Sequence, residues 1–250
     1  MPSRVSAASA SERMGEDMRF DLVLRGWLKY GFSFARGKVL TLLIATASPA
    51  AAEPVRILAF GDSLTQGYGL PEFEGFVPQL QDWLSAQGAE VQVVNGGVSG
   101  DTSAGGAARV AWSLTEDIDA MILTLGGNDL LRGLEPDMTR ANIETILTTA
   151  KDNGVAVLLV GMTAPGNFGP EYKSAFDAIY PDLAERHGTL YFESFFKGLG
   201  SEDLAELRAY FQSDGIHPNA EGVEMIVSAL GPTVLELIET AGAQENGALN

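Results

Sequence analysis

Along most of this chain, short apolar runs alternate with longer segments whose apolar residues repeat on a single side. From Val55 onward the short runs are rich in β-branched residues, as buried strands are, and the longer segments repeat apolar positions with helical spacing. Strands are expected at Val55–Phe60, Val91–Asn95, Ala120–Leu125, Ala156–Val160 and Thr189–Phe192. Helices are expected near Gly75–Gln87, Thr102–Leu114, Asp137–Asn153, Tyr172–His187 and Asn219–Thr240.

This order of elements predicts an α/β fold: a five-stranded parallel sheet with helices on both faces, in a flavodoxin-like α/β/α arrangement. Glycine-rich polar segments follow the first three strands, at 61–63, 96–102 and 126–129. Ligand sites in such sheets form where the carboxyl ends of the strands meet. The three segments are therefore expected to lie together and to form one site.

Residues before position 53 follow a different pattern. An apolar run, Val39–Ala47, is preceded by basic residues and followed by small residues up to Ala52, which is typical of a signal peptide. The run is shorter than the ~20 residues that span a bilayer. We expect residues 1–52 to be an N-terminal extension and signal peptide cleaved after Ala52. The domain 53–250 is then periplasmic with no membrane anchor, and translation starts at the first methionine or at Met18.

Composition narrows the possible partners and chemistry. The chain has 16 basic and 33 acidic residues and a formal charge of -17, which excludes nucleic acid as an expected partner. It has no cysteine, so thiol nucleophiles and thiolate metal sites are excluded. Its two histidines, His187 and His217, are too few for a multi-histidine metal site. We expect no metal and no organic cofactor.

Three residues could support nucleophilic chemistry. Ser63 follows the first strand, and a serine hydroxyl needs a nearby base to become a nucleophile. Asp214 and His217 stand three residues apart before the last helix, where the carboxylate can orient the imidazole. His187 ends a helix, where a cation is favoured, and fits an ordinary surface histidine better. On these residues alone, Ser63 as a simple turn residue stays an alternative.

The other two glycine-rich segments offer hydrogen-bond donors for a negative charge. Backbone N–H groups in the loop 95–102 lie close to a helix start, and the Asn128 amide follows two glycines. The alternatives are a flexible turn capped by Asp101 or Thr102, and a local turn formed by Asn128 or Asp129. Neither the common mononucleotide nor the dinucleotide phosphate-binding pattern is present.

Taken together, four sequence blocks resemble the motifs of GDSL-type, or SGNH, hydrolases. The blocks are GDSLT at 61–65, NGGVSGDTS at 95–103, GGND at 126–129 and DGIHP at 214–218. The resemblance covers nearly all of residues 55–238. Two further segments, 126–136 and 175–184, are similar to a bacterial subgroup of periplasmic thioesterases, lysophospholipases and arylesterases.

The resemblance implies the SGNH hydrolase fold and a serine hydrolase that uses no cofactor. It implies Ser63 as nucleophile, Asp214 and His217 as the rest of a catalytic triad, and an oxyanion hole formed by the Ser63 N–H, Gly100 and Asn128. The implied substrates are short to medium acyl esters, aryl esters, acyl thioesters and lysophospholipids.

The substrate range implied by the resemblance leaves alternatives open. Residues 162–165 stand where relatives line an acyl pocket, but their composition differs, so the acyl length is not fixed. The same loops would serve a carbohydrate esterase that deacetylates polysaccharide or peptidoglycan. A non-catalytic lipid- or glycan-binding module is the alternative from another class. We expect a monomer that acts on a small-molecule or lipid ester.

Overall fold

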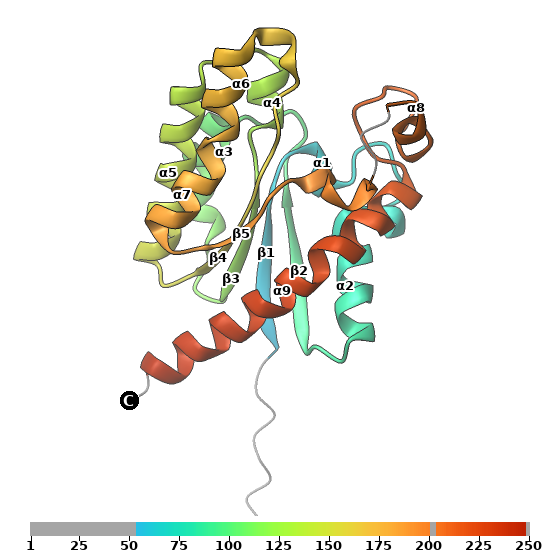
Figure 1. The fold of residues 1–250 in the computed structure, drawn as a ribbon. Coiled ribbons are helices and arrows are strands. Elements are labelled where there is room, and N and C mark those ends of the chain that lie inside the picture. Colours follow the sequence, from blue (N-terminus) through green and yellow to red (C-terminus); the bar gives the residue numbers. More distant parts are fainter. Residues whose placement is uncertain (1–53, 201–203, 249–250) are drawn as a thin grey trace, which may run out of the picture. The chain divides into compact units, whose positions relative to one another are not determined.

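A five-stranded parallel sheet forms the centre of the protein. The computed structural model describes residues 54–200 and 204–248 (Figure 1). The strand order is β2-β1-β3-β4-β5, which is the flavodoxin-like order, and every pair is parallel. The strands are β1 Val55–Gly61, β2 Val91–Gly97, β3 Ala120–Thr124, β4 Ala156–Val160 and β5 Leu190–Phe192. All five expected strands and the predicted fold class are confirmed.

Helices cover both faces of the sheet. One layer holds α2 Phe76–Ala86 and α9 Ala220–Ala248 (Figure 1). The other holds α3 Ser103–Ser113, α5 Pro136–Asp152, α6 Pro170–Asp177 and α7 Ile179–His187. The ends agree with local signals: Asn219 accepts a hydrogen bond from the Gly222 N–H at the start of α9, and Gly154 has a left-handed backbone (φ +72°) just after α5.

The single helix expected over Tyr172–His187 is wrong, because the chain forms two helices, α6 and α7, with a break at Ala178. Pro181 explains the break. Its nitrogen cannot donate to the carbonyl of Asp177, and its ring would collide with that carbonyl in a continuous helix.

Short helices fill the loops and were not expected from the pattern. They are α1 Ser63–Gln66, α4 Gly127–Leu131 and α8 Leu204–Leu207, with the 3-10 turns η1 Glu72–Glu74, η2 Gly166–Phe168, η3 Phe195–Leu199 and η4 Arg208–Tyr210. Two of them, α1 and α4, begin directly after β1 and β3. A helix of one turn has too few residues to show a periodic apolar pattern, so it leaves little trace in the sequence.

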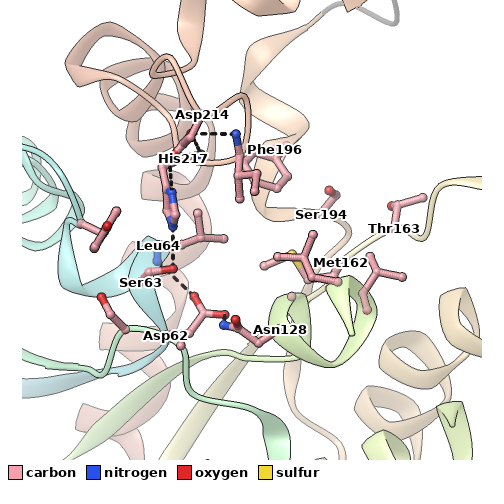
Figure 2. Close-up of a pocket in the computed structure, with 17 residues that line it drawn as sticks. Asp62, Ser63, Leu64, Asn128, Met162, Thr163, Ser194, Phe196, Asp214 and His217 are labelled. Atoms are coloured by element: carbon pink, nitrogen blue, oxygen red, sulfur yellow. Dashed lines mark hydrogen bonds and ion pairs between the residues drawn. The ribbon is translucent and has the colours of Figure 1, made fainter. Parts of the chain in front are cut away.

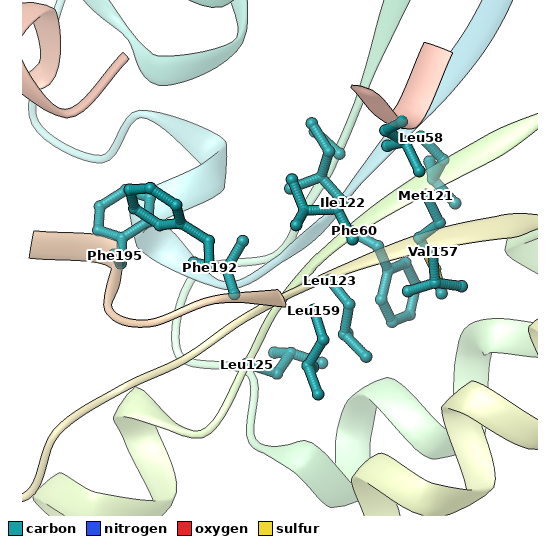
Figure 3. Close-up of a cluster of buried hydrophobic side chains, with 14 of the residues drawn as sticks. Leu58, Phe60, Met121, Ile122, Leu123, Leu125, Val157, Leu159, Phe192 and Phe195 are labelled. Carbon is teal, nitrogen blue, oxygen red and sulfur yellow. The ribbon is translucent and has the colours of Figure 1, made fainter. Parts of the chain in front are cut away.

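The core lies between the sheet and its helices. Every residue of β3 and β4 is buried, as expected for strands covered on both faces. Figure 3 shows part of this core, with Phe60 of β1 near side chains of β3 (Met121, Ile122, Leu123) and β4 (Val157, Leu159). Burying one such side chain fully contributes about 1.5–3 kcal/mol to stability. The core therefore fixes the sheet, and through it the loops at the carboxyl ends of the strands.

Helix α9 is long and apolar enough over Ala220–Gln244 to cross a membrane by length and composition. One of its faces is buried in the core, with apolar residues three or four positions apart: Val223, Ile226, Leu230, Val234 and Leu237. This pattern is that of a core helix of the folded domain. The expected N-terminal extension and signal peptide, 1–52, lie outside the described residues.

Candidate active site

The carboxyl ends of β1, β2 and β3 lie level with one another. Gly61 of β1 pairs with Gly97 of β2 and with Thr124 of β3. A side chain at position 97 would overlap the backbone nitrogen of Gln66, so glycine lets β2 pass close to α1. As expected from the sequence, the three glycine-rich loops start from one edge of the sheet.

Ser63 is the first residue of α1, where the chain turns sharply after β1. Asp62 caps this helix by accepting a hydrogen bond from the Leu64 N–H at 3.0 Å. The Ser63 hydroxyl forms a hydrogen bond of 2.8 Å with Nε2 of His217 (Figure 2). Ser63 is thus more than a turn residue, because its side chain meets a ring that lies 154 positions away in the chain.

Asp214 holds His217 from the opposite side. One carboxylate oxygen, Oδ1, accepts the backbone N–H groups of Ile216 and His217 at 2.9 and 3.0 Å. The other, Oδ2, lies 2.7 Å from Nδ1 of the His217 ring (Figure 2). An ionised carboxylate can only accept, so Nδ1 carries the proton and Nε2 is free to accept from Ser63. The chain thus forms an unbroken Asp–His–Ser hydrogen-bond series.

The electrostatics of this pair favour the same arrangement. The hydrogen bond from the His217 ring, followed by those from the backbone N–H groups of His217 and Ile216, lowers the pKa of Asp214 to about 2. Asp214 is therefore ionised at neutral pH. The ring of Tyr68 packs against His217, with 4.7 Å between ring centroids, and limits where the imidazole can move.

The loop that carries Gly100 is fixed by two arginines. Arg132 donates to the Gly100 carbonyl at 2.8 Å. Arg109 forms an ion pair with Asp101 at 2.7 Å and donates to the Gly61 carbonyl at 2.9 Å, which ties this loop to the end of β1. Within the described residues the N–H groups of Gly100 and Ser63 have no hydrogen-bond acceptor. Both N–H groups are therefore free to bind a ligand.

Asn128 and Asp129 bind residues of other loops. The Asn128 amide donates to Asp62 at 3.2 Å. The Asp129 carboxylate accepts the N–H and the hydroxyl of Ser103, at 2.8 and 2.5 Å, at the start of α3. The alternative of a local turn formed by Asn128 or Asp129 is therefore wrong, whereas Thr102 does cap α3 as considered above.

A cavity of about 510 Å³ brings these groups together. Ser63, His217, Asp214, Gly100 and Asn128 all line it, and its size is that of a typical small-molecule site. Most other lining residues are apolar: Leu64, Tyr68, Leu130, Leu131, Met162, Phe196 and Ile216. Three hydroxyl-bearing residues, Ser99, Thr163 and Ser194, also line it. The segment 162–165 thus contributes to the cavity.

His187 does not take part in this site. It ends α7, as expected, with Nε2 3.9 Å from Oε1 of Glu144. The expectation of a surface histidine is wrong, because only 12% of the His187 side chain is exposed. Within the described residues, no group of three or more histidine, aspartate or glutamate side chains could hold a metal ion.

Sequence reasoning missed several residues of the site. Asp62 and Asp129 lie next to Ser63 and Asn128 in the sequence blocks, yet the pattern gave no sign that their side chains cross to other loops. Phe196 and Ile216 line the cavity from the chain segments after β5. Their apolar side chains gave no chemical signal, and their placement depends on the fold.

Comparison with known proteins shows the family of the chain. Residues 59–225 match the GDSL-like lipase/acylhydrolase family. The chain is 36% identical to the esterase TesA of Pseudomonas aeruginosa, over 80% of this chain and 96% of that protein. It is 33% identical to thioesterase 1/protease 1/lysophospholipase L1 of Escherichia coli, over 88% of this chain and 98% of that protein.

The fold also matches solved structures. The crystal structure of AlinE4, an SGNH-hydrolase family esterase, superposes with a TM-score of 0.62 at 39% identity and covers 75% of this chain and 98% of that one. The resemblance inferred from the four sequence blocks is thereby confirmed. The chain belongs to the GDSL-like lipase/acylhydrolase family, and it is an esterase or acylhydrolase of that family.

Proposed function

We propose that the protein is an exported serine esterase that hydrolyses short to medium acyl esters and aryl esters through a covalent acyl-enzyme. Ser63, His217 and Asp214 are its triad. The observation that carries this proposal is the series of hydrogen bonds of 2.8 Å and 2.7 Å that joins these three side chains at one end of an apolar cavity. Export rests on the signal-peptide pattern of residues 1–52.

In the first half of the reaction, Nε2 of His217 takes the hydroxyl proton while Oγ of Ser63 attacks the ester carbonyl carbon. Asp214 keeps the resulting imidazolium in place and offsets its charge, because its lowered pKa holds it ionised. The imidazolium then gives its proton to the departing alcohol or thiol, and the acyl group stays on Ser63.

The tetrahedral intermediate places a negative charge on the former carbonyl oxygen. The N–H groups of Ser63 and Gly100, which lack intramolecular acceptors in the described part of the chain, and the Asn128 amide are the donors we assign to it. Removing one such donor typically costs a factor of about 10²–10³ in kcat. Their positions are set by separate strand ends, so they are in place before the substrate arrives.

In the second half, a water molecule takes the place of the leaving group. His217 removes its proton as it attacks the acyl carbonyl, and the same donors stabilise the second oxyanion. The imidazolium returns the proton to Oγ of Ser63, and the carboxylic acid leaves.

The cavity wall supports an acyl or aryl substrate more than a sugar. Leu131, Met162 and Ile216 offer no hydrogen bonds to hydroxyl groups but bury methylene or aromatic carbons well. Acyl thioesters and lysophospholipids, which present the same acyl group, are additional substrates in this proposal. The Escherichia coli relative, which is named as a thioesterase and a lysophospholipase, supports them.

The test is hydrolysis of p-nitrophenyl butyrate by the purified domain 53–250 and its Ser63→Ala variant. We expect kcat/KM to fall by at least about 10³-fold, with unchanged circular dichroism. Ser85→Ala is the matched control. Ser85 is exposed on α2, and within the described residues its hydroxyl bonds only to the backbone carbonyl and the side-chain amide of Gln81 in the same helix. Near wild-type hydrolysis by Ser63→Ala would overturn the proposal.

A further inference from the structure

Asp62 is a buried carboxylate that the reaction steps do not use. Its side chain lines the cavity beside Ser63, yet the residue is only 1% exposed. No lysine or arginine of the described residues forms an ion pair with it. Burying a carboxylate without a cationic partner lowers the stability of the fold. A carboxylate kept at this position therefore indicates a function for Asp62.

Its two oxygens bind two different parts of the site. Oδ1 accepts from the Leu64 N–H at 3.0 Å, in the helix that carries Ser63. Oδ2 accepts from the side-chain amide of Asn128 at 3.2 Å, at the end of β3 (Figure 2). A side chain at position 127 would meet Oδ2 at 3.3 Å, so Gly127 allows this approach. One carboxylate thus spans the distance between the nucleophile and Asn128.

The bond to Asn128 also decides which way its amide faces. An amide has a donor end and an acceptor end of nearly equal size, and either can point toward a partner. An ionised carboxylate can only accept hydrogen bonds, so it binds the NH₂ end of the amide and repels the carbonyl oxygen. The NH₂ group is planar, so its second hydrogen is then fixed in direction and left for a ligand in the cavity.

We propose that Asp62 is a positioning residue: it holds the Asn128 amide with its NH₂ group toward the substrate oxyanion and at a fixed place relative to Ser63. The inference rests on the proposed function, because it assumes that Asn128 stabilises an oxyanion. Without Asp62 the amide can turn over and present its oxygen, which would repel the oxyanion in place of binding it.

The energetics of Asp62 agree with a functional reason for the charge. Burial raises the pKa of Asp62 to about 6, against the lowering effects of the Leu64 and Asn128 hydrogen bonds and of His217. The folded protein therefore keeps a group that it would bury more easily as a neutral one. Carboxyl groups whose pKa is raised by burial are common in active sites.

The informative variant is Asp62→Asn. Asparagine is also a good helix cap, so its oxygen can keep the Leu64 bond while its NH₂ group replaces Oδ2. Asn128 then meets a donor and turns its carbonyl toward it, which inverts the group presented to the substrate. We expect kcat for p-nitrophenyl butyrate to fall about 10²-fold with KM within about threefold of the wild type.

A double-mutant cycle separates positioning from a general structural effect. In an Asn128→Ala background, Asp62→Asn should lower kcat by less than about threefold, because the amide it positions is gone. A full, additive loss in that background would overturn the inference, as would wild-type kcat in Asp62→Asn alone. Asp62→Ser, which keeps a cap but leaves Asn128 unrestrained, should also lose activity and serves if Asp62→Asn does not fold.

Two controls complete the experiment. Asp117→Asn removes one acidic charge from an exposed ion pair with Arg56 and should leave kcat unchanged. Ser63→Ala separates the two proposals: if it is fully active, the proposed function fails. If Ser63→Ala is inactive and Asp62→Asn retains full activity, only the role of Asp62 fails.

Discussion

The Asp62→Asn variant should be more stable than the wild type at alkaline pH, although it is less active. Burial raises the pKa of the Asp62 carboxyl from 3.8 to about 6. A carboxyl whose pKa is higher in the folded state binds its proton more tightly there than in the unfolded chain. Its ionised form therefore destabilises the fold fully above about pH 6, and this penalty disappears as the pH falls below about 4.

The size of the effect follows from the two pKa values. A change from 3.8 to about 6 corresponds to about 3 kcal/mol at pH 8, which sets the upper limit of the gain from removing the charge. Rearranged hydrogen bonds around position 62 reduce it, so we expect a gain of about 1–3 kcal/mol. The gain should shrink steadily between about pH 6 and pH 4.

Urea unfolding followed by circular dichroism at pH 8 and pH 4 measures this directly. The free energies of unfolding of wild type and Asp62→Asn should differ at pH 8 and converge at pH 4. Asp117→Asn is the control for the loss of one negative charge at the surface. A variant that is less stable than the wild type at pH 8, or equally stabilised at both pH values, would refute the reasoning that burial of this charge strains the fold.

Three further variants test the packing around the site. Gly97→Ala places a methyl group against the backbone of Gln66 and should displace α1. We expect the free energy of unfolding, measured in urea, to fall by about 1–3 kcal/mol. Steady-state kinetics should show a lower kcat. Asp129→Ala leaves the buried N–H and hydroxyl of Ser103 without their acceptor and should cost about 3 kcal/mol in the same unfolding assay. Met162→Trp narrows the cavity, so kcat/KM for p-nitrophenyl octanoate should fall roughly tenfold more than that for the acetate ester. An equal effect on both esters would mean that the acyl chain lies elsewhere.

The sequence was a good guide where the chemistry and the apolar pattern agree. The strands β3 and β4 are continuous apolar runs because both of their faces are buried, which made them easy to recognise. Ser63, Asp214 and His217 were candidates because their side chains can support nucleophilic chemistry, and the resemblance to the SGNH hydrolase motifs joined them into one triad. Their hydrogen bonds could then be anticipated from the chemistry of the residues.

Contacts between loops could not be read in this way. The bond from Asn128 to Asp62 joins residues 66 positions apart, and that from Ser103 to Asp129 joins residues 26 positions apart. Both depend on the register of the strands that carry the loops, which no local pattern specifies. The break between α6 and α7 is different, since Pro181 was visible in the sequence and its effect on the helix was overlooked.

Covalent labelling shows whether Ser63 is the nucleophile. The domain 53–250 is incubated with a fluorophosphonate, which reacts with activated serine hydroxyls, and the modified peptide is identified by mass spectrometry. We expect a single adduct on Ser63, with parallel loss of p-nitrophenyl butyrate hydrolysis and no adduct in Ser63→Ala. An adduct on another serine would contradict the assignment of Ser63 as nucleophile. Unchanged esterase activity after Ser63 has been labelled would contradict it as well.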